Sequence, residues 1–173
     1  ADPGHVTDAL LALAERRIGA LVAFERGISL RGYEETGVAT DALFSRELVE
    51  TVFTPPLPLH DGGITVRDGR IAAAHCVFPV SNNPNLSGSG MRHRAAVGLS
   101  EDTDAIVVAV SEENGVVSVA HNGRRLRCTG EGARDSLLRW VSKGLPAVPR
   151  RGIMSRILDF RRGGKKKKKG AKR

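Results

Sequence analysis

The sequence predicts a single α/β domain with a central mixed β-sheet flanked by helices. Amphipathic helical segments alternate with short apolar runs, and several of these runs are joined by dipeptides typical of turns. A length of 173 residues fits one domain that can bury its own core, and 40% apolar residues is an ordinary globular value. We therefore expect one folded unit.

Helical periodicity predicts four helices, at residues 6–17, at 45–53, from about 91 onward and at 133–143. The first places Val6, Leu10 and Leu13 on one face, and Gly19 is suited to end it. Prolines within residues 55–59 end the second, because proline cannot continue a helix.

Short apolar runs predict strands at residues 20–26, 63–67, 70–78, 104–110, 115–120 and 124–128. The dipeptides Asp68-Gly69 and Asn122-Gly123 favour hairpin turns, so each is expected to join the strands on either side of it. Strands interleaved with helices, without an internal repeat, indicate one α/β domain with a mixed sheet.

The net charge of +8 comes from the last 13 residues, which hold nine lysines or arginines and no acid. The rest of the chain has 18 basic and 19 acidic residues. Residues 146–173 are predicted to form a flexible basic tail, because a run of like charges beside glycines cannot bury apolar surface. This tail is either a solubilising or appended end, or a segment attracted to an anionic membrane surface. No specific nucleic-acid binding is expected, since the body offers no basic stripe.

No apolar run approaches the ~18 residues needed to span a bilayer, and the chain does not open on a secretory signal. This chain is therefore expected to be soluble. Residues 1–5 are expected to be disordered or an artificial addition. Cys76 and Cys128 form no Cys-x-x-Cys pair, so reduced thiols in a cytosolic compartment are expected.

The stretch SGSGMRHRAAVG, residues 87–98, places Arg92, His93 and Arg94 where a loop is expected to lead into a helix. It matches neither the P-loop nor the dinucleotide-binding glycine pattern. Backbone N–H groups at a helix start are unpaired and attract anions, and arginine forks match phosphate oxygens in pairs. The stretch indicates an anion site, although the same sequence is also compatible with a flexible loop followed by a solvated basic helical turn.

Two further loop stretches carry candidate residues. In LHDGG, Asp61 could hold a divalent metal or accept a proton from a hydroxyl, and His60 could assist as a ligand. In SEENG, Glu112 and Glu113 would point to opposite faces of a continuing strand, so at most one would face the same site. Each stretch alone is also compatible with an ordinary polar turn.

The three stretches occur together, and LHDGG, GMRHRAAVGLSE and VSEENG resemble in order and spacing the diadenylate cyclase domain family. The hallmarks of that family are a D-G-A motif, an R-H-R motif and a downstream S-E-E. Similarity extends to RRIGALVAFERG, YEETGVATDA, SRELVETVF and AAAHCVFPVS, and it is closer to the membrane-anchored subgroup than to the DNA-scanning one. The resemblance implies a catalytic domain with the DAC-type fold over residues 6–145.

The resemblance implies that the chain joins two ATP molecules into cyclic di-AMP and releases two pyrophosphates, with Mn²⁺, Mg²⁺ or Co²⁺ as the metal. It implies a weak or transient homodimer, in which two subunits face each other and each holds one ATP. It also implies transmembrane helices before Ala1, and a location at the cytoplasmic face of the cell membrane for the full-length protein.

Residue roles carry over from the family motif by motif. Asp61 matches the catalytic aspartate that binds metal and helps to activate the hydroxyl, and Arg92, His93 and Arg94 match the catalytic R-H-R that orients the triphosphate. The implied metal ligands are Asp61, Glu113 and His60. The implied ATP-binding residues are Gly62, Gly63, Val77, Phe78, Pro79, Gly90, Met91, Arg92, His93, Arg94, Ser111 and Glu113.

Two positions depart from the family pattern. Gly63 replaces the usual alanine and should loosen the backbone slightly, while Met91 replaces a threonine common before R-H-R and so lacks its hydroxyl. Neither change is expected to abolish activity. Two other functions stay open on the sequence: a nucleotide-binding module that is catalytically weak or inactive, and a protein that binds membranes or polyanions through its lysine-rich tail.

Overall fold

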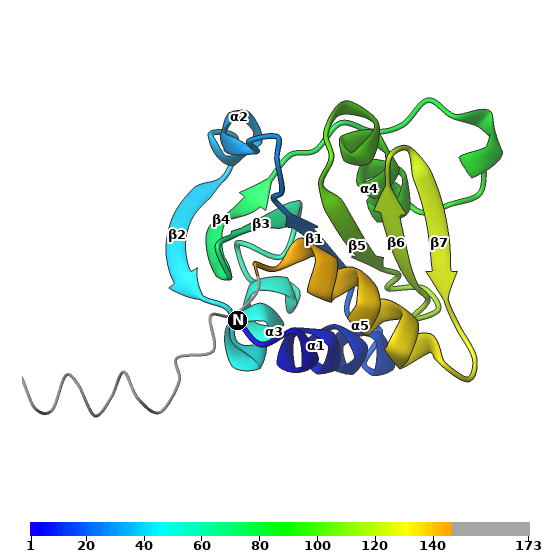
Figure 1. Ribbon diagram of the computed structural model, residues 1–173, viewed down its shortest axis with the longest axis horizontal. Helices are drawn as coiled ribbons and strands as arrows, with labels where there is room; N and C mark the ends of the chain where they lie inside the picture. Colours follow the sequence, from blue (N-terminus) through cyan, green and yellow to red (C-terminus); the bar gives the residue numbers. More distant parts are fainter. Residues whose placement is uncertain (147–173) are drawn as a thin grey trace, which may run out of the picture.

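The protein folds into one α/β domain around a seven-stranded mixed sheet, as predicted (Figure 1). The structure is a computed structural model and describes residues 1–146. Its elements are α1 (Pro3–Glu15), β1 (Ala20–Phe24), α2 (Arg31–Glu34), β2 (Val38–Leu43), α3 (Arg46–Phe53), β3 (Gly63–Arg67), β4 (Arg70–Cys76), the 3₁₀ helix η1 (Pro84–Leu86), α4 (Met91–Asp102), β5 (Ile106–Val110), β6 (Val117–His121), β7 (Arg124–Cys128) and α5 (Ala133–Gly144). The predicted basic tail lies, from residue 147 onward, outside the described residues.

The strands lie in the order β2-β4-β3-β1-β5-β6-β7. Among these strands only β1 and β3 run parallel, and the other neighbours pair antiparallel. Both predicted hairpins are confirmed: Asp68-Gly69 joins β3 to β4, and Asn122-Gly123 joins β6 to β7. All four turn residues have positive φ, a conformation that Asp, Asn and Gly adopt more readily than other residues.

The two faces of the sheet are covered in different ways. In Figure 1, α1, α3 and α5 lie together on one face, where large side chains such as Leu10, Leu13, Phe24 and Phe53 fill the core. On the other face α4 packs against β5 and β6. The core on this face combines larger side chains such as Leu21, Phe78 and Leu99 with several alanines of the strands and loops beneath α4: Ala23, Ala73, Ala105, Ala109 and Ala120. Small side chains allow α4 to lie close to the sheet.

The segment that follows β4 is fixed against α4. A Cβ atom at Gly98, in the middle of α4, would overlap the carbonyl oxygen of Pro79. The N–H of Ser81 donates to the carbonyl of Arg94 at 3.0 Å, and the guanidinium of Arg94 donates back to the Ser81 carbonyl at 3.2 Å. Residues 77–81, which include predicted site residues, are therefore positioned by the helix.

The N-terminal region differs from the prediction. The sequence predicts disorder for residues 1–5, but α1 begins at Pro3, because Asp2 accepts a hydrogen bond from the N–H of His5 and proline fits the first helical turn. The helix also ends earlier than Gly19 suggests. Its last residue is Glu15, and Arg17 takes the left-handed conformation with φ 51.

Two elements were not predicted from the sequence: β2 and the four-residue α2. β2 is an edge strand with mostly exposed side chains and a bulge between Ala39 and Ala42, where Asp41 has φ 43. An exposed, bulged strand carries neither a long apolar run nor a regular alternation, so its sequence gives little signal.

On the other edge of the sheet, α5 packs against β5 and β7. It carries the only tryptophan, Trp140, whose ring centroid lies 5.5 Å from that of His121. The ammonium of Lys143 lies 4.6 Å from the centre of the same ring. Within residues 1–146 no helix is both long and apolar enough to cross a membrane.

We predict that Gly98→Ala lowers the free energy of unfolding by about 2 kcal/mol, because the new methyl would overlap the Pro79 carbonyl. Alanine in a helix is otherwise favoured over glycine by about 1 kcal/mol. Urea unfolding measures the difference. The matched control is Gly32→Ala in α2, where nothing lies within 4 Å of the added Cβ. A Gly98→Ala protein as stable as wild type would contradict the close packing of α4.

Candidate active site

Two adjoining cavities bring the three sequence stretches together. The larger, of ≈ 620 Å³, is lined by Leu21, His60, Asp61, Gly62, His75, Cys76, Val77, Phe78, Val80, Met91, Arg92, Ala95 and Glu112. The smaller, of ≈ 320 Å³, is lined by Ser89, Gly90, Met91, Arg92, His93, Val110, Ser111, Glu112 and Glu113. Met91, Arg92 and Glu112 line both cavities, so the two form one continuous site.

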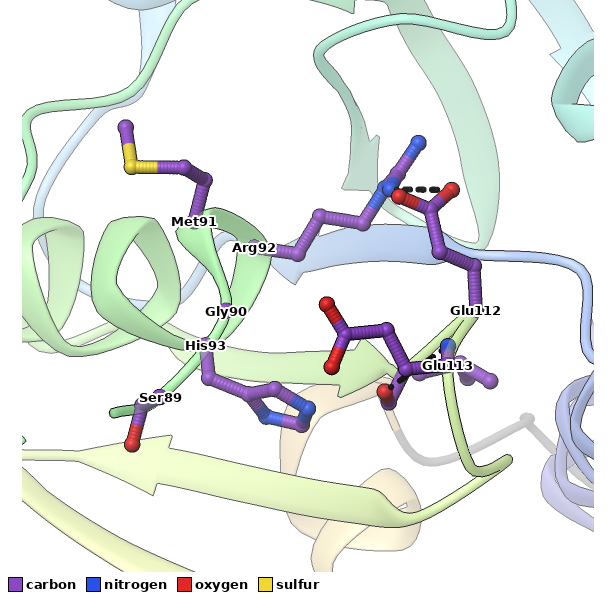
Figure 2. A pocket seen from close by; sticks show the side chains of 9 residues that line it. Ser89, Gly90, Met91, Arg92, His93, Glu112 and Glu113 are labelled. Carbon is purple, nitrogen blue, oxygen red and sulfur yellow. Dashed lines mark hydrogen bonds and ion pairs between the residues drawn. The ribbon is translucent and has the colours of Figure 1, made fainter.

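Arg92 lies where the two cavities meet. Its guanidinium pairs with the carboxylate of Glu112 at 2.9 Å, and Figure 2 shows the two side chains pointing toward each other. A Cβ atom at Gly19 would come within 2.6 Å of Arg92 Nη1, so the guanidinium occupies space that only a glycine leaves open. Arg92 Nε is buried without a hydrogen-bond partner among residues 1–146. This N–H is a donor available to a ligand or a water molecule.

The first turn of α4 faces the smaller cavity. Gly90 precedes the helix and provides no side-chain cap, so the first backbone N–H groups have no partner from a capping side chain. Together with the helix dipole, these groups attract an anion. This geometry supports the anion site that residues 87–98 indicate.

His93 is buried between α4 and the sheet, and a residue of the sheet fixes the position of its ring. Its Nδ1 shares a hydrogen bond with the hydroxyl of Ser118 on β6, and its side chain also lines the smaller cavity. Burial, and after it the positive charges of Arg125, Arg127 and Arg92, lower the pKa of His93 to about 4. The ring is therefore neutral at pH 7 and offers hydrogen bonding rather than charge.

The turn after β5 differs from the prediction for the two glutamates. β5 ends at Val110, and the hydroxyl of Ser111 accepts hydrogen bonds from the N–H groups of Glu113 and Asn114. Because the chain turns here, Glu112 and Glu113 both line the smaller cavity, where a continuing strand would have separated them. In Figure 2 the carboxylate of Glu113 points toward the start of α4.

Asp61 is exposed at the mouth of the larger cavity. Its carbonyl accepts a hydrogen bond from Nδ1 of His75 at 2.8 Å, and its carboxylate accepts one from the N–H of Gly62 at 3.1 Å. His75 has φ 59 and lies beside an irregularity in the β3–β4 pairing. His75 was not predicted as a site residue, because in the sequence it is one more position of a strand.

The apolar wall of the larger cavity is formed by the end of β4 and the residues after it. Val77 is 64% exposed, whereas the ring of Phe78 is buried next to Gly63. A Cβ atom at Gly63 would lie 2.5 Å from Phe78 Cε2. The sequence suggested that Gly63 loosens the backbone. In the structure, the absence of a side chain at Gly63 instead leaves room for the ring of Phe78.

Three predicted site residues line neither cavity. Gly63 lies beneath Phe78, Pro79 packs against Gly98, and the side chain of Arg94 is bonded to Ser81. Their predicted roles in ATP binding stay predictions, and their positions favour support of the cavity walls over direct contact with a ligand.

The predicted metal ligands are carboxylate and imidazole groups, which are donors that divalent metal ions accept. Asp61 lines the larger cavity and Glu113 the smaller, and His60 has Nδ1 bonded to the Leu57 carbonyl, which leaves Nε2 free of that bond. Within residues 1–146 no three His, Cys, Asp or Glu side chains form a metal-binding cluster. Magnesium is commonly held by one or two carboxylates plus phosphate oxygens, so these residues fit a metal only together with a phosphate ligand.

Comparisons with known proteins show to which family the chain belongs. The family model described as "DisA bacterial checkpoint controller nucleotide-binding" (DAC) matches residues 7–125. The cyclic di-AMP synthase CdaA of Bacillus subtilis is 46% identical over 134 residues, which are 77% of this chain and 49% of that protein. A diadenylate cyclase of Mycoplasma genitalium is 38% identical over 80% of this chain and 70% of its own length.

Solved structures are similar as well. A crystal structure of a double mutant of DacA from Staphylococcus aureus superposes with a TM-score of 0.79 at 41% sequence identity, covering 84% of this chain and 95% of that one. The chain belongs to the diadenylate cyclase (DAC) domain family. Within that family it is similar to the CdaA-type proteins, and it spans about half the length of the Bacillus relative.

We predict that His93 makes stability depend on pH. Above pH 6.5 both folded and unfolded states hold a neutral ring, so His93 makes no pH-dependent contribution. As pH falls from 6.5 to about 4, the unfolded chain takes up a proton that the folded chain refuses, and stability falls by up to roughly 3 kcal/mol. Below about pH 4 the folded state is protonated too and the slope disappears.

Urea unfolding at pH 8.5, 7.5, 5.5 and 4.5 measures this dependence. His93→Gln should be less stable than wild type at pH 7.5 and approach it at pH 4.5, because glutamine does not titrate. Because the ring does not titrate between pH 7.5 and 8.5, the difference in stability between the two proteins should be the same at these two pH values, and this comparison is the control. Parallel pH profiles for wild type and His93→Gln would show that the ring is not held neutral by its surroundings.

Proposed function

We propose that this chain is the catalytic domain of a diadenylate cyclase, which condenses two ATP molecules into cyclic di-AMP and releases two pyrophosphates. The observation that carries the proposal is the meeting of LHDGG, R-H-R and S-E-E at one continuous site, in a chain that belongs to the family. The metal would be Mn²⁺ or Mg²⁺, with Co²⁺ as a further candidate. At the site it would neutralise phosphate charge and lower the pKa of a bound hydroxyl.

The two cavities suggest how one ATP would be held. The adenine would lie in the larger cavity against Val77 and Phe78, and the triphosphate would extend past Arg92 into the smaller one. There the start of α4 and Ser111 offer hydrogen-bond donors to phosphate oxygens. Nε2 of the neutral His93 ring would add a donor in the tautomer in which Nδ1 accepts from the Ser118 hydroxyl. Phosphoryl-type transfer requires mainly alignment and charge compensation, which such an arrangement supplies.

Asp61 is proposed as the residue nearest the reacting hydroxyl. Its exposed carboxylate at the mouth of the larger cavity would hold the metal and help to remove the proton from a 3′-hydroxyl. The oxygen then attacks the α-phosphate of the second ATP, an O–P bond forms, and the bond to the leaving pyrophosphate breaks. A second, equivalent step closes the ring.

The reaction requires two copies of the site. One site holds one ATP, whereas each nucleotide of the ring must supply both a hydroxyl and an α-phosphate. Two sites related by a two-fold axis meet this demand with one set of residues. Val77 and Met91 are 64% and 63% exposed at the cavity rims, a small apolar contact that fits a weak or transient homodimer. In a full-length protein, an anchor at the cytoplasmic face of the membrane would raise the local concentration.

We predict that Asp61→Asn lowers the rate of cyclic di-AMP formation by on the order of 100-fold or more, because the amide loses the charge that holds a metal. Thermal stability and most of the ATP affinity should persist. Incubation with ATP and Mn²⁺, followed by mass spectrometry, measures the product. The matched control is Asp68→Asn in the β3–β4 turn, which lines neither cavity and should retain the wild-type rate.

Wild-type turnover by Asp61→Asn at saturating metal would contradict the proposed role. ATP binding without product in the wild-type protein would instead point to a nucleotide-binding module without turnover.

We also predict that specific activity rises with enzyme concentration before it reaches a plateau, because the active species is a dimer. Product formed per mole of enzyme should be measured from nanomolar to tens of micromolar, with sedimentation in parallel. A mixture of wild type with excess Asp61→Asn tests the same point, since mixed dimers would be impaired. Flat specific activity with a persistent monomer would exclude the facing-sites arrangement.

A further inference from the structure

We infer that Arg125 and Arg127 of β7, which lie beside the smaller cavity without lining it, bind the terminal phosphates of a triphosphate, or the pyrophosphate that leaves. The inference rests on the proposed function of that site. Both arginines lie outside the three motif stretches, on the edge strand of the sheet.

The strand register places these two side chains on the face that α4 covers. Arg127 pairs with Ser118, whose hydroxyl is bonded to His93, and Arg125 pairs with Ala120, which is buried beneath α4. Side chains two positions apart on a strand share a face. The neighbouring Arg124 therefore lies on the opposite face.

A direct contact connects β7 to the smaller cavity. Arg125 Nη1 donates to the hydroxyl of Ser89 at 2.7 Å, and Ser89 lines that cavity immediately before Gly90. Burial, and then the charge of Arg127, lower the pKa of Arg125. Arg125 thus contacts the loop that leads into α4, and Arg127 lies two positions further along the same face of β7.

The positive charge in this region is only partly compensated. Arg92 pairs with Glu112, but within residues 1–146 neither Arg125 nor Arg127 forms an ion pair with a carboxylate. All three arginines lower the pKa of His93, in addition to the effect of burial. Clustered cations repel one another, and an anion with several charges relieves this repulsion best. Paired guanidinium forks match phosphate oxygens, which points to a di- or triphosphate group as the ligand.

The test compares Arg125→Gln and Arg127→Gln with Arg124→Gln. All three remove one positive charge from β7, but Arg124 lies on the other face of the sheet. Calorimetry with inorganic pyrophosphate, ATP and AMP, each with Mg²⁺, should show pyrophosphate and ATP bound about tenfold more weakly by the first two variants. AMP affinity should change little, and Arg124→Gln should match wild type. Arg125→Lys and Arg127→Lys should give intermediate affinities, because the charge remains and the fork is lost.

Equal pyrophosphate affinity in wild type and all three glutamine variants would overturn the inference. So would equal weakening by all three, which would indicate a general effect of net charge. The pyrophosphate measurement does not require turnover, so it separates this inference from the proposed function. If the wild-type protein makes cyclic di-AMP and the variants bind ATP as tightly as wild type, the proposed function stands and phosphate binding by Arg125 and Arg127 is rejected. Circular dichroism checks folding, and should a glutamine variant not fold, the lysine variant at that position decides by the same comparison.

Discussion

The close packing of α4 on the sheet is the constraint on which the site depends. At Gly98 the helix receives the carbonyl of Pro79, and the Arg92 guanidinium from its first turn lies against Gly19 at the start of β1. Neither position has space for a methyl group. The small side chains beneath α4 make this approach feasible, since a larger core would lift the helix and carry Arg92 and His93 away from the carboxylates.

Charge at the site is arranged locally and bears little relation to the composition of the chain. The body without its lysine-rich end is nearly neutral, yet arginines from α4 and β7 gather around one buried histidine. Arg92 is compensated by Glu112 at the boundary of the two cavities, whereas Arg125 and Arg127 form no ion pair with a carboxylate within residues 1–146.

Much of the architecture could be predicted from the sequence. The hairpins follow from Asp68-Gly69 and Asn122-Gly123, because few residues tolerate positive φ, and the buried strands follow from unbroken apolar runs. The edge strand β2 could not be predicted, because its side chains are mostly exposed and a bulge at Asp41 interrupts the alternation of apolar and polar residues. Motifs predicted most of the residues that line the two cavities, but not His75, and they included Gly63, Pro79 and Arg94, which line neither. They could not show that Arg94 bonds to Ser81 or that Glu112 and Glu113 share a cavity, because both depend on where the chain turns in space.

The surroundings of Trp140 have a practical consequence. The only indole of the chain lies beside His121 and Lys143, and it lines a cavity together with Arg125 of β7. Its emission is therefore an optical signal for the packing of α5 against the sheet. Unfolding can be followed through intrinsic fluorescence, and because Arg125 lines the same cavity, such scans should be recorded at a fixed ligand concentration.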